Sequence, residues 1–376
     1  MVAVFLALKE MRRAKVRFGL LTAAVGLLVF LVLFQQSLQN GLLTAFVGGI
    51  KNQSAPVLVY SVDGRRNLQG GVIIPELEAQ IRAVEGIGRA GRFSQATFTA
   101  DAGGKQTDAA VIGFEQVGLG SPATLVKGRL PQAPGEAVAN ESDADQGFAI
   151  GDVVTLDPAG FPITVVGLAR DILINVSPTL YVQYDTYEAA VKSRFPDVTT
   201  VLPNALAVEP AAGVSAATLV ERINAVSDDV DALTRADAAA KAPGVAQVRQ
   251  SFSIIFLLYA LVVPFVTGLF FLILTFQKAN ALTLLRAIGA PASRLVQAML
   301  IQVSAVLLGG LAIGIAVYAP ISVQRLGGIS LRFETGAVLF WSVLLFVFGI
   351  ISSLFSARRV LAIDPVAATT GAGVGR

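Results

Sequence analysis

The side chains that most often carry out chemistry are scarce in this chain of 376 residues, which contains no histidine and no cysteine. Ser-His-Asp hydrolysis, imidazole zinc sites and histidine proton relays are therefore excluded. Without cysteine there is no disulfide and no thiolate metal site. An enzyme built from this sequence would depend on carboxylates or lysine alone, so we predict neither catalytic residues nor a metal site.

Nucleotide chemistry is not expected either. Residues 103–106 (GGKQ) contain a Gly-Lys pair like that of a phosphate-binding loop. They lack the upstream glycine, and the Ser or Thr whose hydroxyl binds magnesium in a P-loop. No segment resembles a nucleic-acid-binding motif. We therefore expect no ATP hydrolysis, no cofactor and no nucleic-acid partner for this chain.

A few polar side chains beside apolar sequence could receive a ligand. Gln35, Gln36 and Gln39 follow the first long apolar stretch, and Tyr259 lies within the second. Together they could line a polar vestibule. Alternatively, the glutamines mark the point where the chain leaves the membrane for water.

Four long uncharged stretches must position these residues: Phe18–Phe34, Ser251–Phe276, Leu295–Ile321 and Thr335–Phe355. The hydrocarbon core of a bilayer is about 30 Å thick, which about 20 helical residues cross. Each backbone amide in lipid must be hydrogen-bonded within its own segment, so we expect four transmembrane helices.

The predicted order along the chain has eleven parts. They are an amphipathic helix (1–17), span 1 (18–36), an outer stalk (37–54), an outer domain (55–235), a returning stalk helix (236–250), span 2 (251–276), a loop (277–294), span 3 (295–321), a short outer loop (322–334), span 4 (335–356) and a tail (357–376). The outer domain mixes strand patterns with helix patterns, which is typical of an α+β fold. Asp185 and Ser215 are expected to be the N-caps of two of its helices. The predicted fold class is thus a membrane protein of four transmembrane α-helices, with a large extracytoplasmic α+β domain inserted between spans 1 and 2.

The charges predict the orientation of the spans. Residues 1–17, 277–294 and 357–376 together carry 11 basic and 2 acidic side chains, whereas residues 37–250 carry 16 basic and 23 acidic ones. Short segments rich in lysine and arginine stay in the cytoplasm. We therefore expect a multi-pass protein of the bacterial cytoplasmic membrane with both termini in the cytoplasm.

Two cytoplasmic segments combine apolar and charged residues in a distinctive way. In Phe276–Arg294 (FQKANALTLLRAIGAPASR), a short helix over 281–288 would end at Gly289, and Pro291 would block its extension. Its apolar side chains stand beside Arg286. The second segment, SARRVLAIDPVAA, directly follows span 4.

With the order of the spans, these segments resemble the MacB/FtsX-like ABC transporter permeases, in particular the compact four-span type that includes Hrt-type haem exporters and related efflux permeases. The matching residues are Lys278, Leu284, Leu285, Arg286, Ala287, Ile288, Gly289 and Ala290, then Ala357, Arg358, Asp364, Pro365 and Ala368. The chain departs from the pattern at residues 279–281 (ANA), where many relatives carry acidic residues.

The resemblance implies a homodimer in membrane lipid that binds two copies of a cytoplasmic ATPase, which would hold ATP and Mg. Lys278 and residues 284–289 would contact the ATPase. Arg358, Arg359, Asp364 and Pro365 would add contacts, or the two arginines would bind lipid phosphate. The complex would export a hydrophobic or amphipathic cargo (a lipid, an antibiotic, a peptide or haem) by mechanotransmission. Alternatively, the protein would be an FtsX-like mechanotransmitter or sensor that moves no cargo and relays the state of the ATPase to an extracellular or periplasmic partner.

Overall fold

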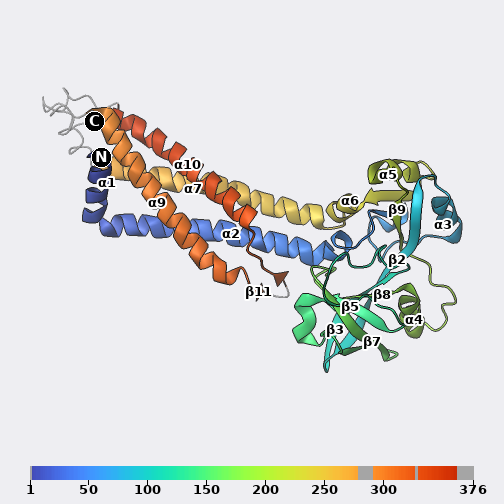
Figure 1. Cartoon of the computed structure of the whole chain (residues 1–376). Coiled ribbons are helices and arrows are strands. Elements are labelled where there is room, and N and C mark those ends of the chain that lie inside the picture. Colours follow the sequence, from blue (N-terminus) through green and yellow to red (C-terminus); the bar gives the residue numbers. More distant parts are fainter. Residues whose placement is uncertain (1, 278–290, 327–328, 362–376) are drawn as a thin grey trace. The chain divides into compact units, whose positions relative to one another are not determined.

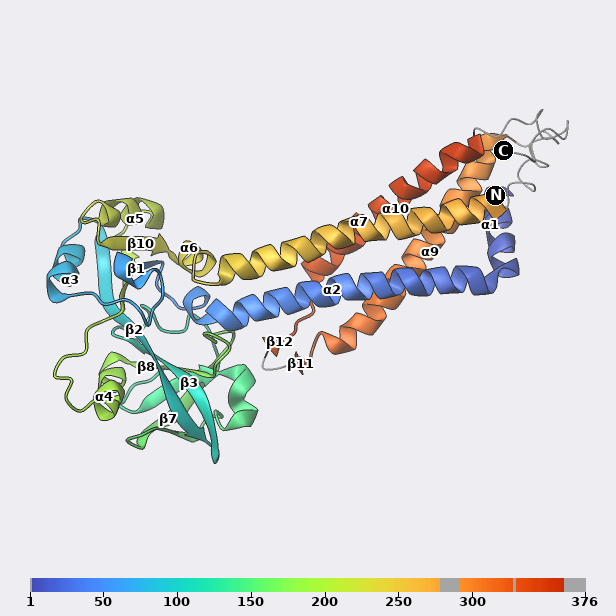
Figure 2. The same cartoon turned by 180° about the vertical axis from the view of Figure 1, so that it is seen from behind.

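The computed structural model describes residues 2–277, 291–326 and 329–361 (Figures 1 and 2). The chain divides into two compact units. The helical unit comprises Met1–Gln39, Gln250–Leu326 and Leu331–Arg376, and the sheet unit comprises Asn40–Arg249 and Gly327–Ser330. The insertion predicted between the first two spans therefore forms a unit of its own.

The helical unit contains the short helix α1 (Val2–Arg13) and long apolar helices. The long helices are α2 (Lys15–Lys51), α7 (Val245–Gln277), α9 (Ala292–Ile321) and α10 (Thr335–Leu361), and parts of α2 and α7 belong to the sheet unit. The short strands β11 (Arg325–Leu326) and β12 (Ile329–Ser330) come between α9 and α10 in the sequence. Within the described residues, four segments are long and apolar enough to cross a membrane: Lys15–Lys51, Val245–Val266, Val296–Ile321 and Thr335–Leu354. The four predicted spans are thus confirmed as apolar helices.

Glycines allow α2 and α9 to pack closely. A Cβ atom on Gly314 would lie 2.7 Å from the carbonyl oxygen of Gly26, and one on Gly310 would lie 2.5 Å from Cγ1 of Val25. A side chain at either position would collide with α2, so only glycine permits this approach. The apolar cluster around the contact also includes side chains of α7 and α10.

A ten-stranded sheet forms the centre of the sheet unit. Its strands are β1 (Val57–Ser61), β2 (Ile87–Ala102), β3 (Lys105–Phe114), β4 (Leu125–Gly128), β5 (Glu136–Asn140), β6 (Val153–Leu156), β7 (Phe161–Ala169), β8 (Thr179–Gln183), β9 (Ala205–Pro210) and β10 (Val230–Thr234). The order is β10-β1-β9-β2-β3-β8-β5-β7-β4, and β6 pairs with β2 and β7. The long strand β2 pairs with β9 through its first half and with β3 through its second, so it joins the two halves of the sheet.

Helices cover both halves of this sheet (Figure 1). α3 (Pro75–Arg82) and α5 (Ala216–Asn224) bury Leu and Ile side chains in one cluster with β1, β9 and β10. α4 (Tyr184–Arg194) buries Tyr187 and Ala190 in a second cluster beside β3. A further cluster contains residues of α2, α6 (Arg235–Ala240) and α7. The predicted α+β domain between the first two spans is therefore confirmed.

Some predicted boundaries differ from the observed ones. α2 begins at Lys15, so residues 15–17 belong to the first apolar helix instead of the amphipathic helix predicted over 1–17. The returning stalk helix predicted over 236–250 is wrong as a single helix. α6 ends at Ala240 and α7 begins at Val245. Between them lies Pro243-Gly244, and Gly244 has φ +84°, which a helix does not accommodate.

The two predicted N-caps have different outcomes. The prediction for Ser215 is confirmed, because its hydroxyl accepts a hydrogen bond from the backbone N–H of Thr218 at 3.1 Å. The prediction for Asp185 is wrong. α4 begins at Tyr184, directly after β8, so its N-cap is Gln183, two residues before Asp185, and Gln183 makes no side-chain capping bond.

Candidate functional site

Most of the predicted ATPase contacts lie outside the described residues. These are Lys278, Leu284, Leu285, Arg286, Ala287, Ile288 and Gly289 in the loop, and Asp364 and Pro365 in the tail. Arg358 and Arg359 fall in the last turns of α10, where only the backbone is described. These assignments remain predictions.

The predicted vestibule residues are only partly brought together. The indole N–H of Trp341 on α10 donates a hydrogen bond to Oε1 of Gln36 at 3.1 Å, and the Gln36 side chain also lies 3.5 Å from that of Gln39. Phe256 of α7 stacks on Trp341 with ring centroids 5.0 Å apart. Tyr259 packs against the apolar cluster of the helical unit, which also contains Trp341. Gln36 thus ties α2 to α10.

A second polar contact ties the loop before α10 to two spans. The hydroxyl of Tyr318 on α9 donates to the carbonyl oxygen of Arg332 at 2.9 Å. The hydroxyl of Ser37 on α2 lies 3.1 Å from the same oxygen, and it also lies 3.1 Å from the Arg332 backbone nitrogen. The backbone at Arg332 therefore connects Ser37, in the second half of α2, with Tyr318, near the end of α9.

The end of α2 is hydrogen-bonded to a loop of the sheet unit. We call this contact, between residues 45–52 and the loop 171–177, the α2 joint. The N–H groups of Asn175 and Val176 donate to carbonyl oxygens of residues 46 and 45 at 3.0 and 2.9 Å. The N–H of Gly49 donates to the carbonyl oxygen of residue 173 at 2.9 Å. The Asn52 amide donates to residue 171 at 2.6 Å, and the hydroxyl of Tyr181 donates to Gly49 at 2.5 Å. The two segments are thus joined by hydrogen bonds in which every acceptor is a backbone carbonyl oxygen.

The α2 joint is tightly packed and its backbone is strained. A Cβ atom on Gly48 would lie 2.3 Å from the carbonyl oxygen of Asp171, and one on Gly49 would lie 2.6 Å from Cγ1 of Ile174. In the loop, Asp171, Asn175 and Val176 all have positive φ, at 59°, 52° and 62°. Such a conformation is unusual for a β-branched residue, and each strained residue costs about 1–3 kcal/mol. The surrounding contacts must outweigh this cost for the loop to keep its shape.

The start of α7 is anchored in the same buried cluster as the end of α2. Ala238 and Val245, from α6 and α7, are buried in one cluster with Val47 and Ile50 of α2. The Arg235 guanidinium donates to the carbonyl oxygen of Gln53 at 2.7 Å. The two helices that connect the sheet unit to the first and second spans therefore end in one common core.

Elsewhere the sheet unit carries a compact ion-pair network. Glu78 on α3 accepts from Arg82 at 2.8 Å and from Arg92 on β2 at 3.2 Å, while Arg82 also contacts Glu115 at 3.0 Å. Burial alone would raise the pKa of Glu78, but hydrogen bonds from Arg92 and Arg82 hold it below the ordinary value. The network fastens α3 to the sheet, and its carboxylates are paired with arginines, which indicates a structural role. Within the described residues, no three Asp or Glu side chains converge as a metal site would require.

Sequence reasoning missed the α2 joint and Trp341. The chain has one tryptophan, and it lies near the start of an apolar stretch. Tryptophan is enriched at membrane boundaries, so this position could have been recognised. For the joint, the signal was the pair Gly48-Gly49 inside a helical pattern, which indicates close approach of another backbone. The loop 171–177 itself offers no pattern that predicts positive φ at Val176.

The geometry defines a multi-span membrane protein with an inserted domain whose core contains the end of α2 and the start of α7. No model of a protein family matches the chain. It is 21% identical over 373 residues to an uncharacterised ABC transporter permease of Mycobacterium tuberculosis, across 98% of this chain and 99% of that protein. It is 23% identical to HrtB of Staphylococcus haemolyticus, assigned as the permease of a hemin transport system, across 97% of this chain and 99% of the relative. The chain therefore resembles ABC transporter permeases along almost its entire length.

Solved structures match the sheet unit only distantly. The periplasmic region of MacB from Actinobacillus actinomycetemcomitans is 16% identical, with a TM-score of 0.36, and the match covers 50% of this chain and 92% of that one. The extracellular domain of the ABC-type transporter YknZ from Gram-positive bacteria is 13% identical, with a TM-score of 0.34, over 47% of this chain and 99% of that one.

Proposed function

We propose that this chain is the permease subunit of an ATP-driven exporter that moves a hydrophobic or amphipathic cargo by mechanotransmission. In this proposal the chain forms a homodimer and binds two copies of a separate cytoplasmic ATPase, which hydrolyses ATP with Mg. The termini and the loop 277–294 face the cytoplasm, and the sheet unit lies outside. The observation that carries the proposal is the α2 joint.

The joint suits a protein that passes movement from one segment to another. A helix can displace a domain only if its end is fixed to that domain, since otherwise the end slips and no work is transmitted. Five hydrogen bonds fix the end of α2, each worth about 1 kcal/mol, and neighbouring side chains are buried. The anchored start of α7 provides the second attachment. Movement of either helix would then reach the sheet through one core.

The drive would enter through the loop outside the described residues. Leu284, Leu285 and Ile288 would sit in a groove on the ATPase with Arg286 at its rim, and Arg358 and Asp364 would add contacts from the tail. ATP binding would move the ends of α7 and α9 that flank this loop. Only contacts that differ between the two states of the complex can drive such a change.

The proposed cargo class follows from the residues next to the outer ends of the spans. Gln35, Gln36 and Gln39 offer polar contacts, whereas the exposed side chains of Leu257 on α7 and Phe340 on α10 offer an apolar surface. An amphipathic molecule matches this combination. The relative from a hemin transport system makes haem one candidate cargo. In this chain an iron ligand near α7 would have to be Tyr259 or an outer glutamate, since histidine and cysteine are missing.

The test is ATP turnover by the purified chain together with the ATPase encoded beside it, titrated with haem, lipids, peptides and amphipathic antibiotics. We expect the rate of ATP turnover to rise with at least one cargo. In Leu284→Asp and Arg286→Glu this stimulation by cargo should be lost. Stable complexes whose turnover ignores every cargo would favour the FtsX-like mechanotransmitter. Failure of the chain to bind any ATPase would refute both the export function and the mechanotransmitter function.

A further inference from the structure

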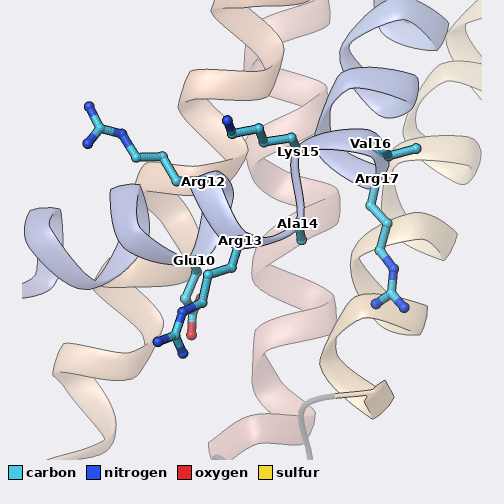
Figure 3. Close-up of a pocket in the computed structure, with 7 residues that line it drawn as sticks. All are labelled: Glu10, Arg12, Arg13, Ala14, Lys15, Val16 and Arg17. Atoms are coloured by element: carbon cyan, nitrogen blue, oxygen red, sulfur yellow. The ribbon is translucent and has the colours of Figure 1, made fainter.

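The corner between α1 and α2 concentrates positive charge around an open cavity. The cavity has a volume of about 640 Å³ and is lined by residues 10 and 12–17, which we call the elbow (Figure 3). Four of its seven side chains are cationic, namely Arg12, Arg13, Lys15 and Arg17, and one is a carboxylate. The chain turns at Ala14, between the end of α1 and the start of α2. An excess of three positive charges therefore surrounds one cavity.

The single carboxylate of the elbow has a structural contact. The side-chain amide of Gln302 on α9 donates to Oε2 of Glu10 at 2.5 Å, and Gln302 is only 2% exposed. Ala7 of α1 is fully buried as well. These contacts fix α1 against α9, so the elbow has a defined shape. Figure 3 shows Arg13 beside Glu10, whereas Arg12 and Lys15 extend away from it.

Exposed apolar side chains flank the cations. Phe5 and Leu8 on α1 are 66% and 52% exposed, and Val16 and Leu20 at the start of α2 are 75% and 68% exposed. Large apolar groups next to arginine and lysine are typical of helices at the surface of a bilayer. There the apolar groups enter the acyl region while the cations stay at the level of the headgroups.

We propose that the elbow binds the headgroup phosphates of anionic phospholipids through the guanidinium groups of Arg12, Arg13 and Arg17 and the ammonium group of Lys15, which point in different directions around the corner (Figure 3). Guanidinium groups bind phosphate oxygens in pairs, and anionic headgroups complement the excess of positive charge at the corner. The apolar neighbours contact the acyl chains. The site would fix the first span in the membrane through a bound lipid. It goes beyond the proposed export function and does not depend on it.

The test counts lipids bound to the intact chain. The detergent-purified protein is titrated with phosphatidylglycerol or phosphatidylcholine of equal acyl chains, and native mass spectrometry reports the bound species. The elbow variant combines Arg12→Gln, Arg13→Gln, Lys15→Gln and Arg17→Gln. A matched control removes four exposed charges from the sheet unit, with Arg65→Gln, Lys105→Gln, Lys127→Gln and Lys241→Gln. A charge-retaining variant carries Arg12→Lys, Arg13→Lys and Arg17→Lys.

We expect phosphatidylglycerol to bind the chain at least fivefold more tightly than phosphatidylcholine, since each cation near a headgroup contributes about a fivefold preference. The preference should disappear in the elbow variant, and persist in the control and in the charge-retaining variant. Equal preference in the elbow variant and the wild type would overturn the proposal. An equal loss of the phosphatidylglycerol preference in the control would also overturn it. Displacement of the lipid by millimolar inorganic phosphate would overturn it too, because it would indicate a site for the free anion. No ATPase or cargo is needed, so the outcome is independent of the export assay.

Discussion

The α2 joint predicts a specific effect of adding one methyl group to Gly48. The new Cβ atom would lie 2.3 Å from the carbonyl oxygen of Asp171 and 3.0 Å from its carbonyl carbon. Neither is a flexible side-chain end, so the loop must move away from α2. Overpacking of this kind costs about 1–3 kcal/mol. The neighbouring hydrogen bonds of Asn52 and Asn175 would weaken as the loop moves.

The assay is hydrogen exchange of the full-length chain, read by mass spectrometry on peptides that contain residues 171–177. In Gly48→Ala we expect the amides of Asn175 and Val176 to exchange about 5- to 150-fold faster, the equivalent of 1–3 kcal/mol in the opening free energy. The matched control is Gly19→Ala in the same helix, where a Cβ atom meets nothing within 4 Å. This control should leave the loop unchanged and slightly stabilise α2, because alanine favours a helix over glycine by about 0.5–1 kcal/mol. Unchanged exchange in Gly48→Ala, or equal acceleration in Gly19→Ala, would refute the close packing of Gly48 against the loop 171–177.

Further predictions concern the sheet core and the spans. Because Arg92 and Arg82 lower the pKa of Glu78 in the folded state, this carboxylate stabilises the sheet unit above the pKa of unfolded glutamate, and the contribution is lost as the pH falls through the lower folded value. The melting temperature should therefore fall on acidification below about pH 4.5, and Glu78→Gln should reduce this dependence; an identical pH profile in the variant would contradict the assignment. Trp341, the only tryptophan, donates to Gln36, so Gln36→Leu should shift its fluorescence emission to the blue, and an unchanged spectrum would show that the hydrogen bond does not form. Gly314→Val should destabilise the helical unit by about 1–3 kcal/mol through collision with α2. Gly336→Ala should not destabilise the helical unit, because a Cβ atom at this position has open space. Equal melting temperatures for the two variants would argue against the close packing of α2 and α9.

The spans and the inserted domain could be predicted because their signals are local. A run of uncharged residues long enough to cross lipid specifies a helix without reference to the rest of the chain. Ser215 was recognised as an N-cap for the same reason, since the capping bond joins residues three apart. Asp185 was misassigned because β8 runs directly into α4, so the strand's end and not the side chain sets the first turn. The break at Pro243-Gly244 did have a local signal, which an alanine-rich helical pattern obscured.

The contacts that position functional residues depend on segments far apart in the sequence. Residues 45–52 meet residues 171–177 only because the sheet places β7 and β8 beside the end of α2. Likewise, Gln36 was predicted as a polar lining residue, but its partner Trp341 comes from the last span, and no pattern near either residue indicates the pair. A sequence read alone therefore identifies which side chains could act, while the fold decides which of them meet.

The most direct test of the account is ATP-driven uptake of the stimulating cargo into inside-out vesicles that contain the chain and its ATPase, because export from the cell corresponds to movement into the lumen of an inverted vesicle. The wild type and Gly19→Ala should export at equal rates. Gly48→Ala should still bind the ATPase and hydrolyse ATP but export less cargo per ATP, because the weakened joint no longer passes the movement of α2 to the sheet unit. Export per ATP that is the same in Gly48→Ala and Gly19→Ala would contradict transmission through the α2 joint.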